Sequence, residues 1–89
     1  MFEWDEAKSD RCLRERGYNF AFASGIFDGP ILEWDDDRRN YGERRVVAVG
    51  RTQGFVLVVV YTLRGDVRRI ISSWPAKKEI RDVYQALHG

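Results

Sequence analysis

The spacing of apolar and polar residues changes along the chain, from helical periods in the first third to strand-like alternation afterwards. Residues 2–4 alternate apolar, charged and apolar, which predicts a short strand. Asp5 can cap a helix that runs to Arg16, because Gly17 is a typical C-terminal stop. The apolar face expected for this helix is thin and consists chiefly of Ala7 and Leu13.

A second helix is expected after Asn19, whose short polar side chain can cap it. Phe20, Ala23 and Phe27 are spaced to share one face of that helix. The sequence Asp-Gly-Pro at residues 28–30 then breaks it.

Strand-like segments dominate the rest of the chain, where β-branched residues are concentrated. Strands are expected over residues 31–34, 45–52, 55–63 and 67–73. Gln53 and Gly54 leave a two-residue hairpin turn, and residues 64–66 form a second tight turn, so the last three strands make an antiparallel meander. The middle strand is apolar from Phe55 to Val60 and is therefore expected to be covered on both faces.

A final helix can open at Pro75, where a missing N–H costs nothing. Its apolar positions recur at helical spacing and are Ile80, Val83, Tyr84 and Leu87. The elements predict an α+β fold, in which a small antiparallel sheet is packed by two N-terminal helices and one C-terminal helix. At 89 residues the chain has room for one domain, residues 1–89.

Composition narrows the expected location to the cytoplasm. The single cysteine, Cys12, cannot form an internal disulfide. The longest apolar run, residues 55–61, is seven residues long, whereas a membrane-spanning helix needs ~20. Acidic residues at positions 3, 5 and 6 do not fit a signal peptide.

Charge is distributed unevenly along the chain. Residues 1–37 carry ten acidic and four basic side chains, whereas residues 38–89 carry four acidic and eleven basic ones. Arginine outnumbers lysine by twelve to three, and its guanidinium suits bidentate phosphate contacts and stacking on bases. The basic half therefore predicts a polyanionic partner, although a bipolar surface that pairs with itself would have the same composition.

Four sequence blocks occur in order along the chain. They are FEWDEAK from Phe2, GE-R from Gly42 to Arg45, YT-RGD from Tyr61 to Asp66, and RIIS from Arg69. Together they resemble the BrnT family of toxins. The resemblance implies a ribonuclease toxin with a RelE-like fold. It also implies a BrnA-like antitoxin, a ribbon-helix-helix DNA-binding protein, with operator DNA bound only through the toxin–antitoxin complex.

Cleavage of RNA without a metal requires two proton transfers and stabilisation of charge on the phosphate, because the 2′-hydroxyl attacks the neighbouring phosphorus. The candidate catalytic residues are Lys8, Glu43, Arg64 and Arg69, which comprise three cations and one carboxylate base. The candidate RNA-binding residues are Arg16, Arg45, Tyr61, Trp74 and Tyr84. Packing alone could also explain several of them, since Glu43 can pair with a neighbouring arginine and the tyrosines can be core residues.

The chain departs from the family pattern at three positions. Arg16, Leu63 and Trp74 stand where the family commonly has histidine, glutamate and arginine. Arg16 could replace the charge of the histidine and Trp74 could stack on a base. Alternatively, the chain is a weakened or inactive toxin that acts as an antitoxin-binding module. A third alternative is a nucleic-acid-binding domain unrelated to toxins.

Cofactor chemistry is not expected. One cysteine and His88, one residue from the C-terminus, give no metal-binding pattern. The acidic run at residues 35–37 lacks the spacing of a calcium loop and is expected to be a solvated loop.

Overall fold

The first strand and helix begin and end where their capping residues predict. In the computed structural model, which describes residues 1–89, β1 (Phe2–Trp4) is followed by α1 (Glu6–Arg16). The Asp5 carboxylate accepts hydrogen bonds from the first backbone N–H groups of α1. Gly17 ends the helix with a φ of 85°, a left-handed conformation that glycine adopts without a Cβ penalty.

The predicted apolar face of α1 is wrong. Ala7 is exposed and Leu13 is 48% exposed, whereas Ser9 and Cys12 are buried. Ser9 can be buried because its hydroxyl accepts a hydrogen bond from the backbone N–H of Phe20 at 3.0 Å. The helix thus packs through small side chains that allow a close approach to its neighbours.

The second predicted helix divides into two short segments, α2 (Phe20–Ala23) and a 3-10 turn, η1 (Ser24–Asp28). The turn lies very close to the sheet. A Cβ at Gly25 would lie 2.4 Å from the Thr52 side chain, and a Cβ at Gly50 would lie 2.8 Å from Ile26 Cβ. These two glycines therefore let η1 contact the strand beneath it.

Five strands form one mixed sheet in the order β1-β5-β4-β3-β2. The other four strands are β2 (Ile31–Asp35), β3 (Val46–Thr52), β4 (Phe55–Arg64) and β5 (Val67–Pro75). Their antiparallel pairing confirms the predicted meander and the Gln53-Gly54 hairpin. The expected sheet was antiparallel throughout, but β1 pairs with β5 in parallel. This pairing brings together segments more than 60 residues apart, so no turn sequence between them could predict it.

The C-terminal helix, α3 (Lys78–His88), begins later than predicted, because Pro75 is the last residue of β5 and not the start of the helix. Of the four apolar residues expected on its face, Tyr84 is buried and Ile80 is half-buried. Val83 and Leu87 are 49% and 62% exposed. The helix therefore contacts the sheet along a narrow strip.

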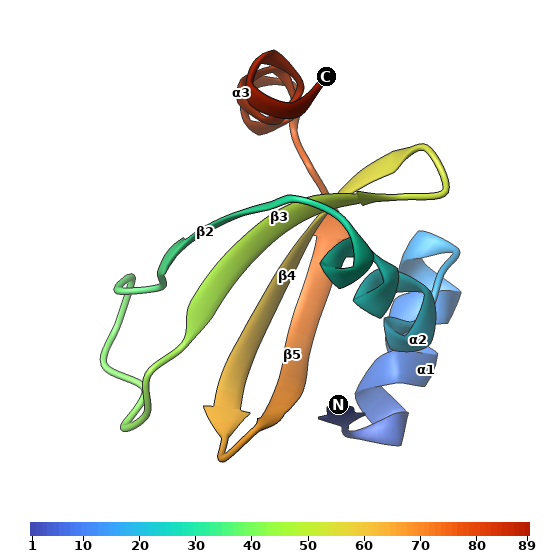
Figure 1. Cartoon of the computed structure of the whole chain (residues 1–89). Coiled ribbons are helices and arrows are strands. Elements are labelled where there is room, and N and C mark those ends of the chain that lie inside the picture. Colours follow the sequence, from blue (N-terminus) through green and yellow to red (C-terminus); the bar gives the residue numbers. More distant parts are fainter.

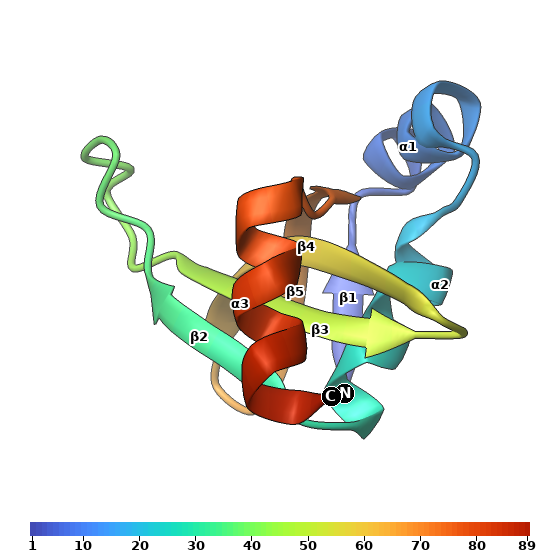
Figure 2. The same ribbon diagram turned by 90° about the horizontal axis from the view of Figure 1, so that it is seen from above.

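The helices lie on opposite faces of the sheet. Figure 1 shows α1 and α2 together on one side, and in Figure 2 α3 passes over the strands away from them. We call the side under α1 and α2 the helix face; its core includes Phe20, Ile26 and Tyr61. The other side, the open face, has a smaller core around Val49, Val58 and Tyr84. Val56 to Tyr61 of β4 are buried, which confirms the predicted burial of this strand from both sides except at Phe55, which is 61% exposed.

Candidate functional site

A β-bulge decides which side chains of β5 reach the open face. Val60 pairs with Ser72 and Tyr61 pairs with Ile70, which leaves Ile71 as the extra residue. Beyond a bulge the alternation of side chains is shifted by one position. Arg69 and Trp74 consequently share the open face, although they are five residues apart.

Three arginines gather at one end of the open face, and we call Arg45, Arg64 and Arg69 the arginine face. Arg69 pairs with Thr62 across β5 and β4, and the Thr62 hydroxyl donates to the backbone carbonyl of Arg44 at 2.7 Å. Arg45, the next residue, directly precedes β3. Arg45 and Arg69 thus flank Thr62 on adjacent strands, with backbones separated by about 10 Å. Arg64 ends β4 on the same side and is exposed.

Two of these arginines hold carboxylates. Arg45 Nε lies 3.1 Å from Glu43 Oε2, and Arg69 Nη1 lies 2.6 Å from Glu3 Oε2. All four side chains remain between 26% and 39% exposed. Ion pairs at this level of exposure are worth about 0–1 kcal/mol, so a phosphate can compete for either guanidinium.

The loop between β2 and β3 is fixed beside the arginine face by Asp36. Its carboxylate accepts from Arg38 Nε at 2.7 Å and Nη2 at 2.8 Å, and from the Tyr41 hydroxyl at 3.2 Å. The hydrogen bond from Arg38 is the main reason that the pKa of Asp36 falls to about 2. Tyr41 in turn lies under Arg45, whose guanidinium carbon is 4.0 Å from the ring centroid.

The expectation that the whole acidic run is solvated is therefore wrong for Asp36, which is 7% exposed. Its neighbours Asp35 and Asp37 are exposed. Sequence reasoning missed Asp36 and Tyr41. The tyrosine five residues after a carboxylate in an arginine-rich segment was the available signal.

Trp74 lies farther along the open face, at a shallow pocket of about 170 Å³ that Trp34 and Ile80 also line. The Arg38 guanidinium carbon is 5.8 Å from the indole centroid. The indole is half-buried. Part of its surface therefore already contacts the loop that Asp36 fixes.

Tyr61 lies on the helix face, away from the arginine face. Its ring is buried and its hydroxyl donates a short hydrogen bond to Glu33. Burial is the main cause that raises the pKa of Tyr61, and the hydrogen bond to the Glu33 carboxylate raises it further. Arg68 lies over this ring and over Phe27, 5.4 and 4.3 Å from the two centroids. Glu33 and Arg68 were not anticipated from the sequence. Glu33 lies on β2, which is separated from the strand of Tyr61 by β3, whereas Arg68 lies on β5, which pairs directly with that strand.

Lys8 and Arg16 are together in a separate basic hollow of about 290 Å³ between α1 and the end of β5. Arg11 and Ser72 also line this hollow. Tyr84 projects from α3 into the core, where its hydroxyl donates to the carbonyl of Pro30 at 2.7 Å. Of the nine predicted site residues, the structure brings Glu43, Arg45, Arg64 and Arg69 to one end of the open face and places Trp74 farther along it.

The ion pairs also bear on the uneven charge of the chain. Glu3, Asp35 and Asp36 from the acidic segment pair with Arg69, Arg44 and Arg38 from the basic one. Part of the charge asymmetry is thus balanced within the folded chain, as the bipolar interpretation expects. The arginines that remain unpaired include Arg64 and Arg16.

No three histidine, cysteine, aspartate or glutamate side chains gather closely enough to hold a metal ion. None of the helices is both long and apolar enough to span a bilayer.

Comparison with protein families gives a match over most of the chain. The family described as "Ribonuclease toxin, BrnT, of type II toxin-antitoxin system" matches residues 4–79. These residues include β2 to β5, α1 and α2, and the arginine face. A search of curated proteins found no match.

Proposed function

The chain belongs to the BrnT family of ribonuclease toxins of type II toxin–antitoxin systems, and we propose that it cleaves RNA at the arginine face without a metal ion. The observation that supports this site is the presence of three arginines at one end of one sheet face, with two partly exposed carboxylates beside them. Guanidinium groups supply the positive charge that a scissile phosphate requires.

In the proposed reaction Arg45 and Arg69 hold the two non-bridging oxygens of the phosphate. Glu43, released from Arg45 as the phosphate binds, takes the proton of the 2′-hydroxyl. The 2′-oxygen forms a bond to phosphorus, the bond from phosphorus to the 5′-oxygen breaks, and the 5′-oxygen takes a proton from water. The products are a 2′,3′-cyclic phosphate and a free 5′-hydroxyl.

Four other predicted residues are assigned to binding. Arg64 is exposed at the β4–β5 turn and can contact a neighbouring phosphate. Trp74 lies on the same face and can stack on a base with the exposed part of its indole. Lys8 and Arg16 would contact RNA in the separate hollow between α1 and β5.

As a type II toxin the chain has a cognate antitoxin. We propose that this antitoxin is a BrnA-like ribbon-helix-helix protein and that the complex represses its own operon by binding operator DNA through the antitoxin. RNA cleavage would inhibit translation and arrest growth in the cytoplasm when the antitoxin is absent.

Induction of the chain in a bacterial host tests this function. Growth arrest with loss of intact RNA is expected, together with rescue by co-expression of the neighbouring antitoxin gene. Substitution of both Arg64 and Arg69 by alanine should remove the arrest, whereas Arg14→Ala on the exposed side of α1 should not. Arrest that persists in the soluble, folded double variant would overturn the assignment of the arginine face.

A weakened toxin that retains antitoxin binding is the second candidate, and a specific observation favours it. Both Arg45 and Arg69 are already paired with carboxylates, and Trp74 stands where the sequence resemblance leads us to expect an arginine. If the folded wild-type chain causes no arrest but co-purifies with the antitoxin, this second function is the correct one.

A further inference from the structure

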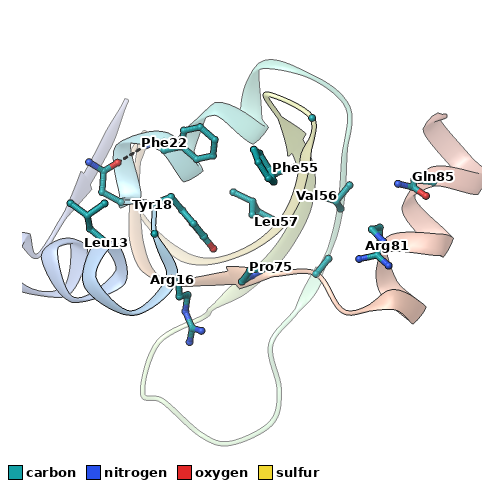
Figure 3. Close-up of a pocket in the computed structure, with 14 residues that line it drawn as sticks. Leu13, Arg16, Tyr18, Phe22, Phe55, Val56, Leu57, Pro75, Arg81 and Gln85 are labelled. Atoms are coloured by element: carbon teal, nitrogen blue, oxygen red, sulfur yellow. Dashed lines mark hydrogen bonds between the residues drawn. The ribbon is translucent and has the colours of Figure 1, made fainter.

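A groove larger than the two hollows described above lies at the other end of the sheet from the arginine face. It is a groove of about 730 Å³ between the α1–α2 pair and α3, and its floor is formed by the start of β4 and the end of β5. Figure 3 shows Tyr18, Phe22, Phe55 and Leu57 along it. Phe55 and Thr62 are seven residues apart on β4, which corresponds to about 23 Å.

The groove exposes large apolar side chains that nothing in the fold covers. Phe55 is 61% exposed and Leu13 is 48% exposed, and both line it. Contiguous exposed apolar surface of this kind, bordered by polar side chains, is typical of a site where another molecule binds. The exposure of Leu13, unexpected for the only leucine of α1, thus has an explanation in the groove.

The charges around the groove are of one sign. Its fourteen lining residues include Arg16 and Arg81 but no aspartate or glutamate. Figure 3 places Arg16 on the α1 side and Arg81 on α3, so the two cations border the groove from different walls. An occupant that matches this surface needs an apolar strip with carboxylates beside it.

We infer that this groove binds an amphipathic helix of a protein partner, with apolar side chains on one face and acidic residues along its edges. Amphipathic helices bind such grooves through apolar residues at positions i, i+3, i+4 and i+7. The inference rests on the proposed function only where it identifies the partner, which in a type II system is the antitoxin.

A polypeptide fits this groove better than RNA. Tyr18 and Phe22 pack at 53° to one another, and Phe22 and Phe55 at 65°, so these rings contact each other instead of presenting parallel platforms for bases. The remaining apolar lining is aliphatic, with Leu13, Val56, Leu57, Pro75 and Ala76. Partner binding at this groove leaves the arginine face uncovered, and Arg16 is the only arginine assigned to RNA that also lines the groove.

The test uses a synthetic 18-residue helical peptide with leucines at i, i+3, i+4 and i+7 and glutamates beside them, added to the isotope-labelled full chain. Amide shifts in NMR spectra should change saturably at groove residues. A matched peptide with lysine in place of each glutamate should bind at least tenfold more weakly. Absence of saturable shifts at the groove with peptide up to about 1 mM would overturn the inference.

Matched variants locate the contact. Phe55→Asp should weaken peptide binding at least tenfold, as should Arg16→Glu combined with Arg81→Glu. Leu63→Asp and Arg14→Glu change an equally exposed leucine and an exposed arginine outside the groove, and should leave binding unchanged. Equal weakening by Leu63→Asp would contradict a specific helix-binding groove.

A paired activity measurement separates this inference from the proposed function. Phe55→Asp should lose peptide binding and keep RNA cleavage, and Arg69→Ala should show the reverse. Peptide binding without any cleavage by the wild type would overturn the proposed ribonuclease activity alone. Cleavage without peptide binding would overturn the groove alone.

Discussion

The arginines on the two faces of the sheet differ in whether they pair with carboxylates. On the helix face Arg68 lies over the rings of Phe27 and Tyr61, and its Nε is buried without a hydrogen-bond partner. On the open face Arg45 and Arg69 hold carboxylates that remain partly exposed. Arg45 also lies over the ring of Tyr41, 4.0 Å from its centroid. Arg68, which has no carboxylate partner, therefore contributes to packing, whereas the ion pairs of Arg45 and Arg69 can be exchanged for a phosphate.

The largest expected effect is a loss of stability on substitution in the core of the helix face. Phe20 is 2% exposed, so Phe20→Ala should lower the free energy of unfolding by about 3–5 kcal/mol, through lost burial and the cavity left behind. Phe55→Ala, at 61% exposure, should cost less than about 1 kcal/mol. Urea denaturation followed by tryptophan fluorescence measures both values. Similar losses for the two variants would contradict the packing described for the helix face.

The open face should respond in RNA binding instead of stability. The Arg45→Ala, Arg69→Ala double variant should change the free energy of unfolding by less than about 1 kcal/mol, because its ion pairs are partly exposed. Its affinity for single-stranded RNA should fall at least tenfold. The slope of log affinity against log salt should decrease by about 1.4, or about 0.7 per lost phosphate contact. Fluorescence anisotropy over a range of KCl concentrations measures this slope, and an unchanged slope would exclude phosphate contacts at these residues.

The Tyr61 hydroxyl tests whether a tyrosine on the helix face serves stability or RNA binding. Tyr61→Phe keeps the buried ring and loses the hydrogen bond to Glu33, so the free energy of unfolding should fall by about 1 kcal/mol. Its position on the helix face predicts unchanged RNA affinity. A fall in RNA affinity at unchanged stability would instead support the sequence-based assignment of Tyr61 to RNA binding.

The smallest effect is a pH dependence at the loop beside the arginine face. The pKa of Asp36 is about 2 in the folded chain, below its ordinary value of 3.8. Ionised Asp36 therefore adds to the free energy of unfolding above pH 4, and this contribution is lost as the pH falls towards 2. Because Arg38 is largely exposed, this contribution should be about 1 kcal/mol. Asp36→Asn should remove that part of the acid dependence in thermal unfolding curves, and an unaltered curve would contradict the ion pair.

Local signals in the sequence predicted most of the fold, because caps, turns and strand periods act over a few residues. Asp5, Asn19 and Gly54 fall where the structure uses them. The parallel pairing of β1 with β5 and the bulge at Ile71 depend on contacts between distant segments, which no local pattern reveals. Leu13 was expected on the buried apolar face of α1. It lines the groove instead, because the helix packs against its neighbours through Ser9 and Cys12.

The candidate site was only partly readable for the same reason. The start of β3, the end of β4 and the start of β5 lie at one end of the open face. This arrangement brings together Glu43, Arg45, Arg64 and Arg69. Glu33 and Asp36 could not be distinguished from solvated acids in the sequence. Glu33 obtains its partner Tyr61 only when β2 is placed in the sheet beside β3 and β4. Asp36 has partners only two and five residues later, Arg38 and Tyr41, but their pairing depends on how the loop folds back on itself.

The most direct test of the proposed ribonuclease site is cleavage of single-stranded RNA by the purified chain in the presence of EDTA. The wild type should produce fragments that end in 2′,3′-cyclic phosphate. The Arg45→Ala, Arg69→Ala variant should cleave at least 100-fold more slowly, which corresponds to a loss of about 2.7 kcal/mol of transition-state stabilisation. Cleavage by the folded variant at the wild-type rate would contradict the account.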